Sequence, residues 1–454
     1  EFDISVLSPN YTGSEKTSLY NDAVMLNDLS RDELILRERA LLERFSIHKE
    51  AGLTLDLTRG KPSPEQLSLS DELDGMVGGE FRAADGTDLR NYGGLTGMSE
   101  ARQLGAELLG VSAEDVIAGG NSSLSLMYQY LLHAWLHGPL DAETAWKLEP
   151  GPIKFLCVVP GYDRHFTIVE SLGFELINVR LTDGGPDIEQ IEDLVASDPS
   201  IKGIWCVPKY SNPTGHIYSD EIVKRLAHIP KIAGPNFRIM WDNAYAVHDF
   251  DDNPPVLDNI FTHCEIAGTK NNVVQFASTS KVTRAGAGIS FLAASQANRD
   301  SFTKALGIQT IGPDKLNQLR HVRFLKDIDG IRALMRGHAA IVKPKFERVI
   351  THLTDGLASD DIGSWTKPRG GYFLSFEAPE GLATEIVKLS AEAGVKLTPA
   401  GATFPHGLDP RDTNIRIAPT YPSLDEIDQA MPVFVTAVSL AAVRKLLQST
   451  EKPA

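Results

Sequence analysis

Cysteine is scarce in this chain, and acidic residues outnumber basic residues. Only three cysteines occur in 454 residues, which excludes a disulfide framework and indicates buried, reduced thiols. Asp and Glu number 60 against 44 Lys and Arg, a formal net charge of −16, so nucleic-acid binding is not expected to be the main role. We find no signal peptide and no apolar run near the roughly 20 residues that span a bilayer. We therefore expect a cytoplasmic protein without nucleic-acid or membrane partners.

The composition that remains is typical of a globular protein with more than one core. Apolar residues make up 42% and charged residues 23% of the chain, and its length favours two domains. We expect an N-terminal arm over residues 1–29, a small domain formed by residues 30–60 and 345–454, and a large ligand-binding domain over residues 61–344.

Short apolar runs alternate with helical stretches in the middle of the chain. The runs are Val116–Ala118, Phe155–Val159, Glu175–Arg180, Gly203–Val207, Arg238–Trp241, Val273–Ala277 and Ser290–Ala294. This pattern predicts an α/β fold whose large domain has a mainly parallel seven-stranded sheet covered on both faces. Ligands of such sheets bind beyond the carboxyl ends of the strands.

The smaller α+β domain is predicted from both ends of the chain. Ser30 and Glu33 form a capping-box pattern at the start of a helix that runs to about Glu50. Strands are expected at residues 372–376, 395–398 and 414–417, with helices at 383–393 and 424–447. Between the domains we expect helices from residue 296 to 357, broken near Gly312 and near Gly337.

Polar motifs follow several of the predicted strands of the large domain. In chain order they are the glycine turn with Gly120, Asn121 and Ser122, then Tyr162, the Asn-Pro-Thr-Gly run from Asn212, Asp242 with Tyr245, and Ser278, Ser280 and Lys281. Each has an ordinary alternative: a helix cap, a turn tyrosine, a tight turn, an aspartate paired with an arginine, or a surface lysine.

Together these motifs fit one ligand. A helix N-terminus binds phosphate, an aromatic ring stacks on a planar ring, and a buried aspartate needs a cationic partner such as a protonated nitrogen. A lysine whose pKa is lowered by burial forms Schiff bases. The set therefore indicates pyridoxal 5′-phosphate (PLP), and we expect no metal.

At these motifs the chain resembles the class I/II aminotransferases, PLP enzymes of the aspartate aminotransferase fold (fold type I). The resemblance covers roughly residues 30 to 447. The segments Leu57–Pro62 and Ser278–Gly288 are similar to an atypical branch, the MocR-like aspartate aminotransferases.

The resemblance implies a role for each matching residue. Lys281 would form the Schiff base and shuttle a proton, Asp242 would keep the ring nitrogen protonated, and Tyr245 would bond the phenolic oxygen together with Asn212. Tyr162 would stack on the ring. The phosphate would be served by Gly120, Asn121, Ser122, Ser278 and Ser280.

Further positions concern the substrate and the partner subunit. Arg416 would grip the substrate α-carboxylate, alongside Asn212, and the backbone of Gly60 would approach the substrate. Tyr92 would reach the phosphate in a neighbouring subunit, which implies a homodimer with shared active sites.

One position departs from the family pattern. Members usually carry a phosphate-binding arginine eight residues after the lysine, and here that residue is Ile289. Arg284, three residues after Lys281, is expected to substitute; the alternative is a phosphate held by hydroxyls and backbone alone.

The expected reaction is a ping-pong transamination between aspartate and 2-oxoglutarate. No receptor for the substrate's side-chain carboxylate is identified. Candidates are Arg37, Arg39, Arg320 and Arg323, with Lys61 less favoured. A β-lyase or a transaminase for another amino acid is the alternative. An aminotransferase-like transcription regulator is disfavoured, because only about 50 residues precede Leu55, too few for a DNA-binding module.

Overall fold

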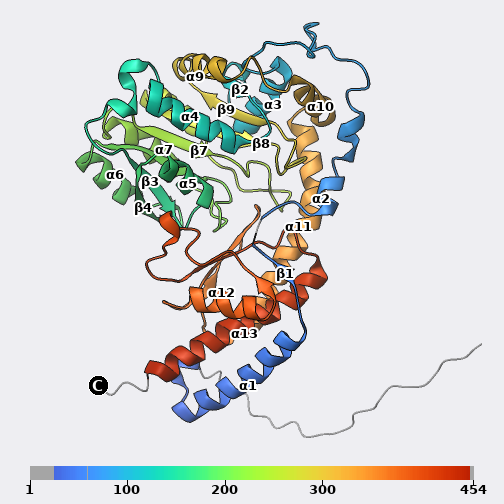
Figure 1. The fold of residues 1–454 in the computed structure, drawn as a ribbon, viewed down its shortest axis with the longest axis vertical. Coiled ribbons are helices and arrows are strands. Elements are labelled where there is room, and N and C mark those ends of the chain that lie inside the picture. Colours follow the sequence, from blue (N-terminus) through green and yellow to red (C-terminus); the bar gives the residue numbers. More distant parts are fainter. Residues whose placement is uncertain (1–24, 59, 450–454) are drawn as a thin grey trace, which may run out of the picture.

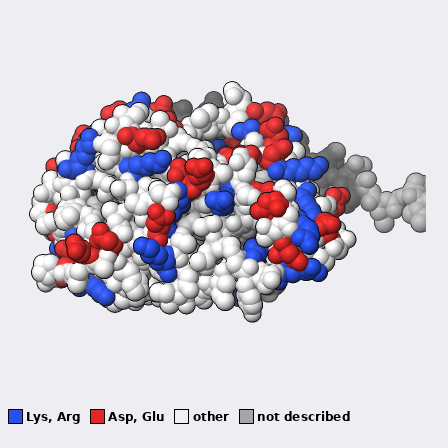
Figure 2. Space-filling view, turned by 90° about the horizontal axis from the view of Figure 1, so that it is seen from above, with Lys and Arg blue, Asp and Glu red and all other residues white. Residues whose placement is uncertain are grey.

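Two lobes make up the molecule, and the long helix α11 (Ile328–Leu357) runs from one to the other (Figure 1). The computed structural model describes residues 25–58 and 60–449. Most of the predicted arm, residues 1–24, lies outside the described residues. Figure 2 shows acidic and basic side chains interspersed over the face seen from above.

An eight-stranded sheet forms the centre of the larger lobe. Its strands are β2 (Val116–Ala118), β3 (Lys154–Val159), β4 (Glu175–Thr182), β5 (Gly185–Pro186), β6 (Ile201–Cys206), β7 (Arg238–Asp242), β8 (Val273–Ser278) and β9 (Ser290–Ala294). Their order is β2-β9-β8-β7-β6-β3-β4-β5. The five strands from β8 to β4 are parallel, whereas β9 is antiparallel to both of its neighbours and β5 is antiparallel to β4.

All seven predicted strands are present in this sheet, which confirms the fold class. The eighth strand, β5, was not predicted. It contains two residues, and it pairs with the end of β4 across the turn between Thr182 and Gly185. A two-residue strand has no apolar run that a sequence pattern could reveal.

Helices cover both faces of the sheet. The helices of the large lobe are α2 (Pro64–Ser68), α3 (Ser99–Leu109), α4 (Ser123–His137), α5 (Asp163–Ser171), α6 (Ile188–Ser197), α7 (Asp220–His228), α8 (Ile260–Ala267), α9 (Gln296–Gln309) and α10 (Lys315–Leu325). Successive strand residues point to opposite faces. One set packs with α3, α6, α7 and α8, and the other with α4, α5 and α9.

The smaller lobe combines both ends of the described chain. It contains α1 (Arg31–Glu50), β1 (Leu55–Asp56), β10 (Ser364–Trp365), β11 (Leu374–Glu377), α12 (Ala383–Glu392), β12 (Val395–Lys396), β13 (Asn414–Ile417) and α13 (Leu424–Ser449). Strands β10, β11 and β13 form an antiparallel sheet, and β1 pairs with β12 in parallel. The capping box of Ser30 and Glu33 is confirmed at the start of α1.

One helix prediction needs correction. The predicted break at Gly337 is wrong, because Gly337 lies inside α11. The break lies instead at Lys326, whose φ is +64°, and the Asp327 side chain then caps α11 by accepting from the Gly330 amide at 2.9 Å. The proposed domain boundary at residues 344 and 345 also falls within this continuous helix.

Helix α13 corrects the expectation that no apolar run approaches a membrane span. Within residues 25–58 and 60–449 it is the one helix that is long and apolar enough, by length and composition, to cross a bilayer. Of its most apolar window, 72% is buried inside the protein. Core helices of folded lobes pass the same test, and α13 packs against α1, α11 and α12.

Candidate active site

Polar side chains from the ends of several parallel strands line one cavity of about 230 Å³. Of the predicted site residues, the cavity is lined by Ser122, Tyr162, Asn212, Asp242, Tyr245, Ser278, Ser280 and Lys281. They come from the carboxyl ends of β3, β6, β7 and β8 and from the start of α4. Parallel strands bring their carboxyl ends to the same edge, so residues more than 100 positions apart meet there.

Asp242 ends β7 and is 3% exposed. Its Oδ2 accepts a hydrogen bond from His165 Nε2 at 3.0 Å, and the His165 ring stacks on Trp205 with centroids 4.1 Å apart. Its Oδ1 is buried and has no hydrogen-bond partner among the described residues. Such an atom costs about 1–3 kcal/mol unless a ligand or water satisfies it. The carboxylate is therefore fixed on one side and open to a donor on the other.

Lys281 follows β8, and its amine lies near two tyrosine rings. Nζ is 4.9 Å from the Tyr245 ring centroid and 5.7 Å from that of Tyr372. Burial lowers the pKa of Lys281 from its usual value because desolvation disfavours the ammonium form, while the charge of Asp242 opposes this shift. A larger share of the amine is therefore neutral and nucleophilic than at an exposed lysine.

The tyrosines of the cavity remain protonated. Burial raises the pKa of Tyr245 well above its ordinary range. Burial, with the charges of Asp242 and Asp163, raises the pKa of Tyr162 to about 12. Both phenols are thus hydrogen-bond donors at neutral pH.

A cradle of hydroxyls and backbone groups lies beside Lys281 at the start of α4. Ser122 is the N-cap of α4, and its side chain makes no capping bond to the described residues. Ser280 Oγ donates to the Asn121 carbonyl at 3.2 Å and accepts from Ser278 Oγ at 3.1 Å. Asn121 Nδ2 donates to the Gly286 carbonyl at 3.2 Å, so Asn121 closes the loop rather than lining the cavity. The Gly120 carbonyl likewise accepts from the Ser290 amide at 2.8 Å.

Arg284 is not where the sequence predicted it. Its Nη1 donates to Asp74 Oδ1 at 2.8 Å, and its Nη2 contacts the Ser70 carbonyl at 3.4 Å. It does not line the cavity. Asp71 and Asp74, about 210 positions away in sequence, hold the guanidinium of Arg284 outside the cavity. This arrangement favours the alternative of hydroxyls and helix amides for the anion.

Arg416 approaches from β13 of the small lobe and is 7% exposed. Its Nη1 donates to Asn212 Oδ1 and to Asp163 Oδ1, each at 3.3 Å, and its Cζ lies 4.9 Å from the Phe373 ring centroid. Both hydrogen bonds are long. A guanidinium group can bind a carboxylate more strongly, through two parallel hydrogen bonds. The structure thus joins Arg416 and Asn212, as predicted for one binding site.

Gly60 and Tyr92 lie outside the cavity lining. A Cβ at Gly60 would come within 2.4 Å of the Phe373 ring, so glycine is required there for close packing below Arg416. Tyr92 is 84% exposed. It makes no contribution to the cavity of its own chain.

The candidates for a side-chain carboxylate receptor do not meet at the cavity. Within the described chain, none of Arg37, Arg39, Arg320, Arg323 and Lys61 lines it. Arg37 pairs with Asp360 at 2.6 Å, and Arg323 donates to two backbone carbonyls near α2. Lys61 lies 3.8 Å from the Tyr421 ring centroid.

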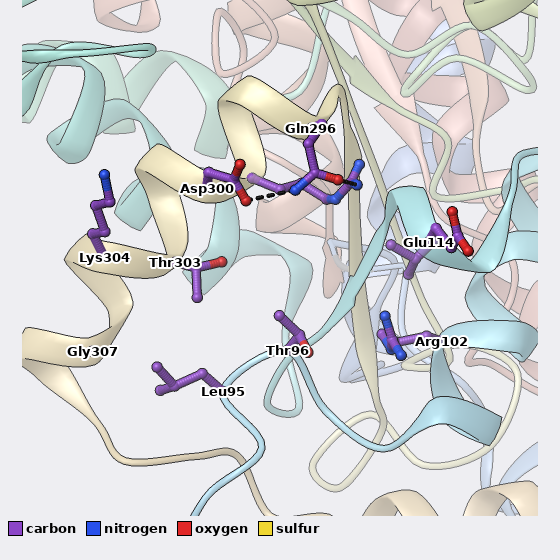
Figure 3. Close-up of a pocket in the computed structure, with 11 residues that line it drawn as sticks. Leu95, Thr96, Arg102, Glu114, Gln296, Asp300, Thr303, Lys304 and Gly307 are labelled. Carbon is purple, nitrogen blue, oxygen red and sulfur yellow. Dashed lines mark hydrogen bonds between the residues drawn. The ribbon is translucent and has the colours of Figure 1, made fainter.

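A larger hollow lies between α3 and α9 and contains none of the predicted site residues (Figure 3). Gln296 donates to Asp300 at 2.6 Å and accepts from Arg299 at 2.6 Å, and Arg299 also pairs with Asp115 at 2.8 Å. Arg299 and Asp300, which lie on α9, therefore already have partners in this hollow.

Sequence reasoning missed several contacts of the cavity. His165 was detectable, because it lies three residues after Tyr162 at the start of a helix and so faces the same side. Tyr372 and Phe373 follow Gly370 and Gly371. Paired glycines indicate that the backbone approaches another segment closely, but they do not show which segment. Asp163, which accepts from Arg416, follows Tyr162 directly, and no sequence pattern links it to β13.

Comparisons with known proteins agree with this geometry. The family model described as aspartate amino-transferase matches residues 29–450. The chain belongs to this family. A protein of Mycolicibacterium smegmatis is 48% identical over 422 residues, covering 92% of this chain and 98% of that protein. An aspartate aminotransferase of Corynebacterium glutamicum is 45% identical over 421 residues, covering 92% and 97%.

Solved structures show the same fold for this aminotransferase. The crystal structure of an aspartate transaminase from Corynebacterium glutamicum matches with a TM-score of 0.91 and 44% identity, over 94% of this chain and all of that one. An α-aminoadipate aminotransferase from Thermus thermophilus, complexed with N-(5′-phosphopyridoxyl)-L-leucine, matches with a TM-score of 0.70 and 20% identity, over 95% and 100%. The second likeness concerns the fold alone.

Proposed function

We propose that this aminotransferase uses PLP to transfer the amino group of aspartate to 2-oxoglutarate. The observation that supports the cofactor is Asp242, which lines the cavity of Lys281 and whose buried Oδ1 has no partner among the described residues. The 45% identity to a named aspartate aminotransferase supports the substrate pair.

The residues of the cavity fit PLP. Asp242 offers an anionic acceptor for a protonated ring nitrogen, Asn212 and Tyr245 lie beside it, and Lys281 presents a partly neutral amine. The start of α4 with Ser122 and the hydroxyls of Ser278 and Ser280 suit a phosphate. When bound, PLP supplies an electron sink for the pair left by a broken Cα–H bond.

The chain's own groups perform the remaining tasks. Arg416 and Asn212 hold the substrate α-carboxylate and so orient its Cα–H bond. Lys281 Nζ removes the Cα proton and later returns one, which its lowered pKa favours. His165 fixes Asp242 through a 3.0 Å hydrogen bond. Tyr245 lines the cavity with a phenol that stays protonated and can donate a hydrogen bond to the phenolic oxygen of PLP.

A survey of half-reactions tests the substrate proposal. Each amino acid is added to the purified holoenzyme without a keto acid, and the visible absorbance of the bound cofactor is followed. We expect aspartate and glutamate to convert it, with oxaloacetate and 2-oxoglutarate as products, and alanine and leucine to convert it slowly or not at all.

Three other results would contradict this function. Absence of conversion by both dicarboxylic amino acids would overturn the substrate assignment. Pyruvate and ammonia released from a cysteine conjugate, without any keto acid, would favour a β-lyase. A regulator would instead be retained on DNA at low salt.

We also propose that two copies of the chain form a homodimer through the surface around Tyr92. Tyr92, Ile308 and Ile311 are 84%, 79% and 59% exposed. Ile308 lies in the last turn of α9 and Ile311 follows it, and Lys315 Nζ, at the start of α10, donates to the Asn91 and Gly93 carbonyls beside Tyr92 at 2.8 and 2.6 Å. Large exposed apolar side chains gathered in one place mark association surfaces.

Sedimentation measures this association. We expect a dimer for the wild type and a monomer for an Ile308→Glu, Ile311→Glu variant, because two buried unpaired carboxylates would disrupt the interface. Ile266→Glu, at a position 77% exposed on α8, should remain dimeric. A monomeric wild type would contradict the proposal.

The MocR-like branch is a further proposal, supported by the segments Leu57–Pro62 and Ser278–Gly288. A tree of full-length family members that separated the chain from that branch would contradict it.

A further inference from the structure

Tyr210 has a backbone conformation that is unusual for a bulky residue. Its φ is +51°, in the left-handed region, and its side chain is 1% exposed. Such strain persists only where surrounding contacts hold it, and it is frequent at functional sites. Tyr210 stands two residues before Asn212, at the entrance of the turn in which the Gly215 amide bonds the Ser211 carbonyl at 2.6 Å.

The Tyr210 hydroxyl is held by a fixed carboxylate. It donates to Asp249 Oδ1 at 2.6 Å. Asp249 also pairs with Lys209 Nζ at 2.7 Å, and Lys209, only 7% exposed, donates to the Ala246 carbonyl at 2.9 Å. A buried ammonium needs such partners. If the Asp249 side chain turned away, the charge of Lys209 would stay buried without its ion-pair partner, which is costly. The loop that carries Asn212 is thereby tied to the loop that carries Tyr245.

The ring of Tyr210 packs against a segment of the other lobe. A Cβ on Gly370 would lie 2.4 Å from the Tyr210 ring, and one on Gly371 would lie 2.7 Å from Tyr210 Cβ. The Gly371 amide donates to the His248 carbonyl at 2.9 Å, and Gly370 forms a bridge with Asp249. Two residues later the same segment places the Phe373 ring 4.9 Å from Arg416.

Both neighbours of Arg416 therefore depend on Tyr210. Asn212, which accepts from Arg416 at 3.3 Å, follows it in sequence, and Phe373 follows the two glycines packed on its ring. We propose that Tyr210 is a positioning residue for the substrate α-carboxylate, locked between Asp249 and the Gly370–Gly371 turn so that Asn212 and Phe373 fix the Arg416 guanidinium. This inference rests on the proposed function of Arg416 and extends it to a residue that does not line the cavity.

The test is Tyr210→Phe in the full-length holoenzyme, which keeps the ring packing and removes the bond to Asp249. The probe is 2-methylaspartate, which presents the α-carboxylate but has no Cα proton to lose. We expect its Kd, measured by calorimetry, to rise about tenfold, the size of one lost hydrogen bond to a charged group. KM for aspartate should rise similarly, kcat should change less, and the Kd of the cofactor should stay within about twofold.

A matched variant separates positioning from general destabilisation. Tyr130→Phe removes a buried hydroxyl that donates to Asn298, on α9, at 2.8 Å and accepts from Arg238 Nε at 3.3 Å; it should lower the Tm without altering the Kd of 2-methylaspartate. Asp249→Ala removes the acceptor of the Tyr210 hydroxyl and also the partner of buried Lys209, so it should weaken 2-methylaspartate and lower the Tm as well. The double variant Tyr210→Phe, Asp249→Ala should bind 2-methylaspartate with the same Kd as Asp249→Ala, since the bond between Tyr210 and Asp249 is already lost in the single variant.

An unchanged Kd in Tyr210→Phe, with a fall in Tm like that of the control, would overturn the proposal and leave Tyr210 a packing residue. Failure of the proposed function looks different. In that case the wild type would convert no aspartate, and the comparison would use the 2-methyl analogue of whichever amino acid it converts, since every donor carries an α-carboxylate.

Discussion

Replacement of Lys281 by alanine is expected to reduce transamination by about 10⁴-fold or more. The variant loses both the nucleophile of the cavity and the base nearest to the substrate Cα, and general-base catalysis alone is worth about 10²–10⁴-fold. Nζ of Lys281 lies 4.9 and 5.7 Å from the ring centroids of Tyr245 and Tyr372, and burial lowers the pKa of this amine. Single-turnover rates with aspartate measure the loss.

A chemical readout identifies the lysine independently of rate. Sodium borohydride should attach the cofactor irreversibly to Lys281 in the wild type, as peptide mass mapping would show, and to no lysine in Lys281→Ala. The control is Lys304→Ala, at an exposed position in the hollow of Figure 3, which should retain both the label and the rate. A label on another lysine, or normal turnover by Lys281→Ala, would contradict the assignment.

The side chains at the carboxyl edge of the sheet could be predicted from sequence, because the parallel topology determines which positions meet there. Asn212, Asp242 and Lys281 each follow an apolar run, and a parallel sheet brings such positions together whatever the connections are. The side chains at this edge are therefore in the cavity as predicted. Their roles toward PLP, the shared active sites and the cytoplasmic location stay predictions.

Arg284 shows where this reasoning ends. Its distance from Lys281 in sequence is only three residues, but the intervening turn directs its guanidinium to Asp74, 210 positions away. No local pattern encodes that choice. Tyr210 and Asp249 are the same case: their bond depends on a left-handed backbone conformation and on packing against the other lobe. Sequence periodicity predicts elements and edges, whereas loop conformation depends on contacts made after they assemble.

Asp242→Asn is expected to separate catalysis from the stability of the apoprotein. The amide keeps the shape and a hydrogen bond to His165, but it cannot hold a ring nitrogen in its protonated form. We expect kcat to fall by about 10²–10³-fold, the range for removal of one preorganised electrostatic contact. The increase in Tm on adding PLP should shrink, because a ligand stabilises a protein according to its affinity for the folded state.

The apoprotein should respond much less. Asp242 Oδ1 is buried without a partner among the described residues, and the isosteric amide leaves one polar atom unpaired at the same place, so the Tm of the apoprotein should change little. As control, Asp198→Asn breaks the 2.7 Å pair with Lys154, away from the cavity, and should leave kcat and the PLP-induced gain in Tm unchanged. If Asp242→Asn kept the wild-type kcat, Asp242 would be only a structural partner of His165, and its Oδ1 would accept a hydrogen bond from a buried water and not from the cofactor.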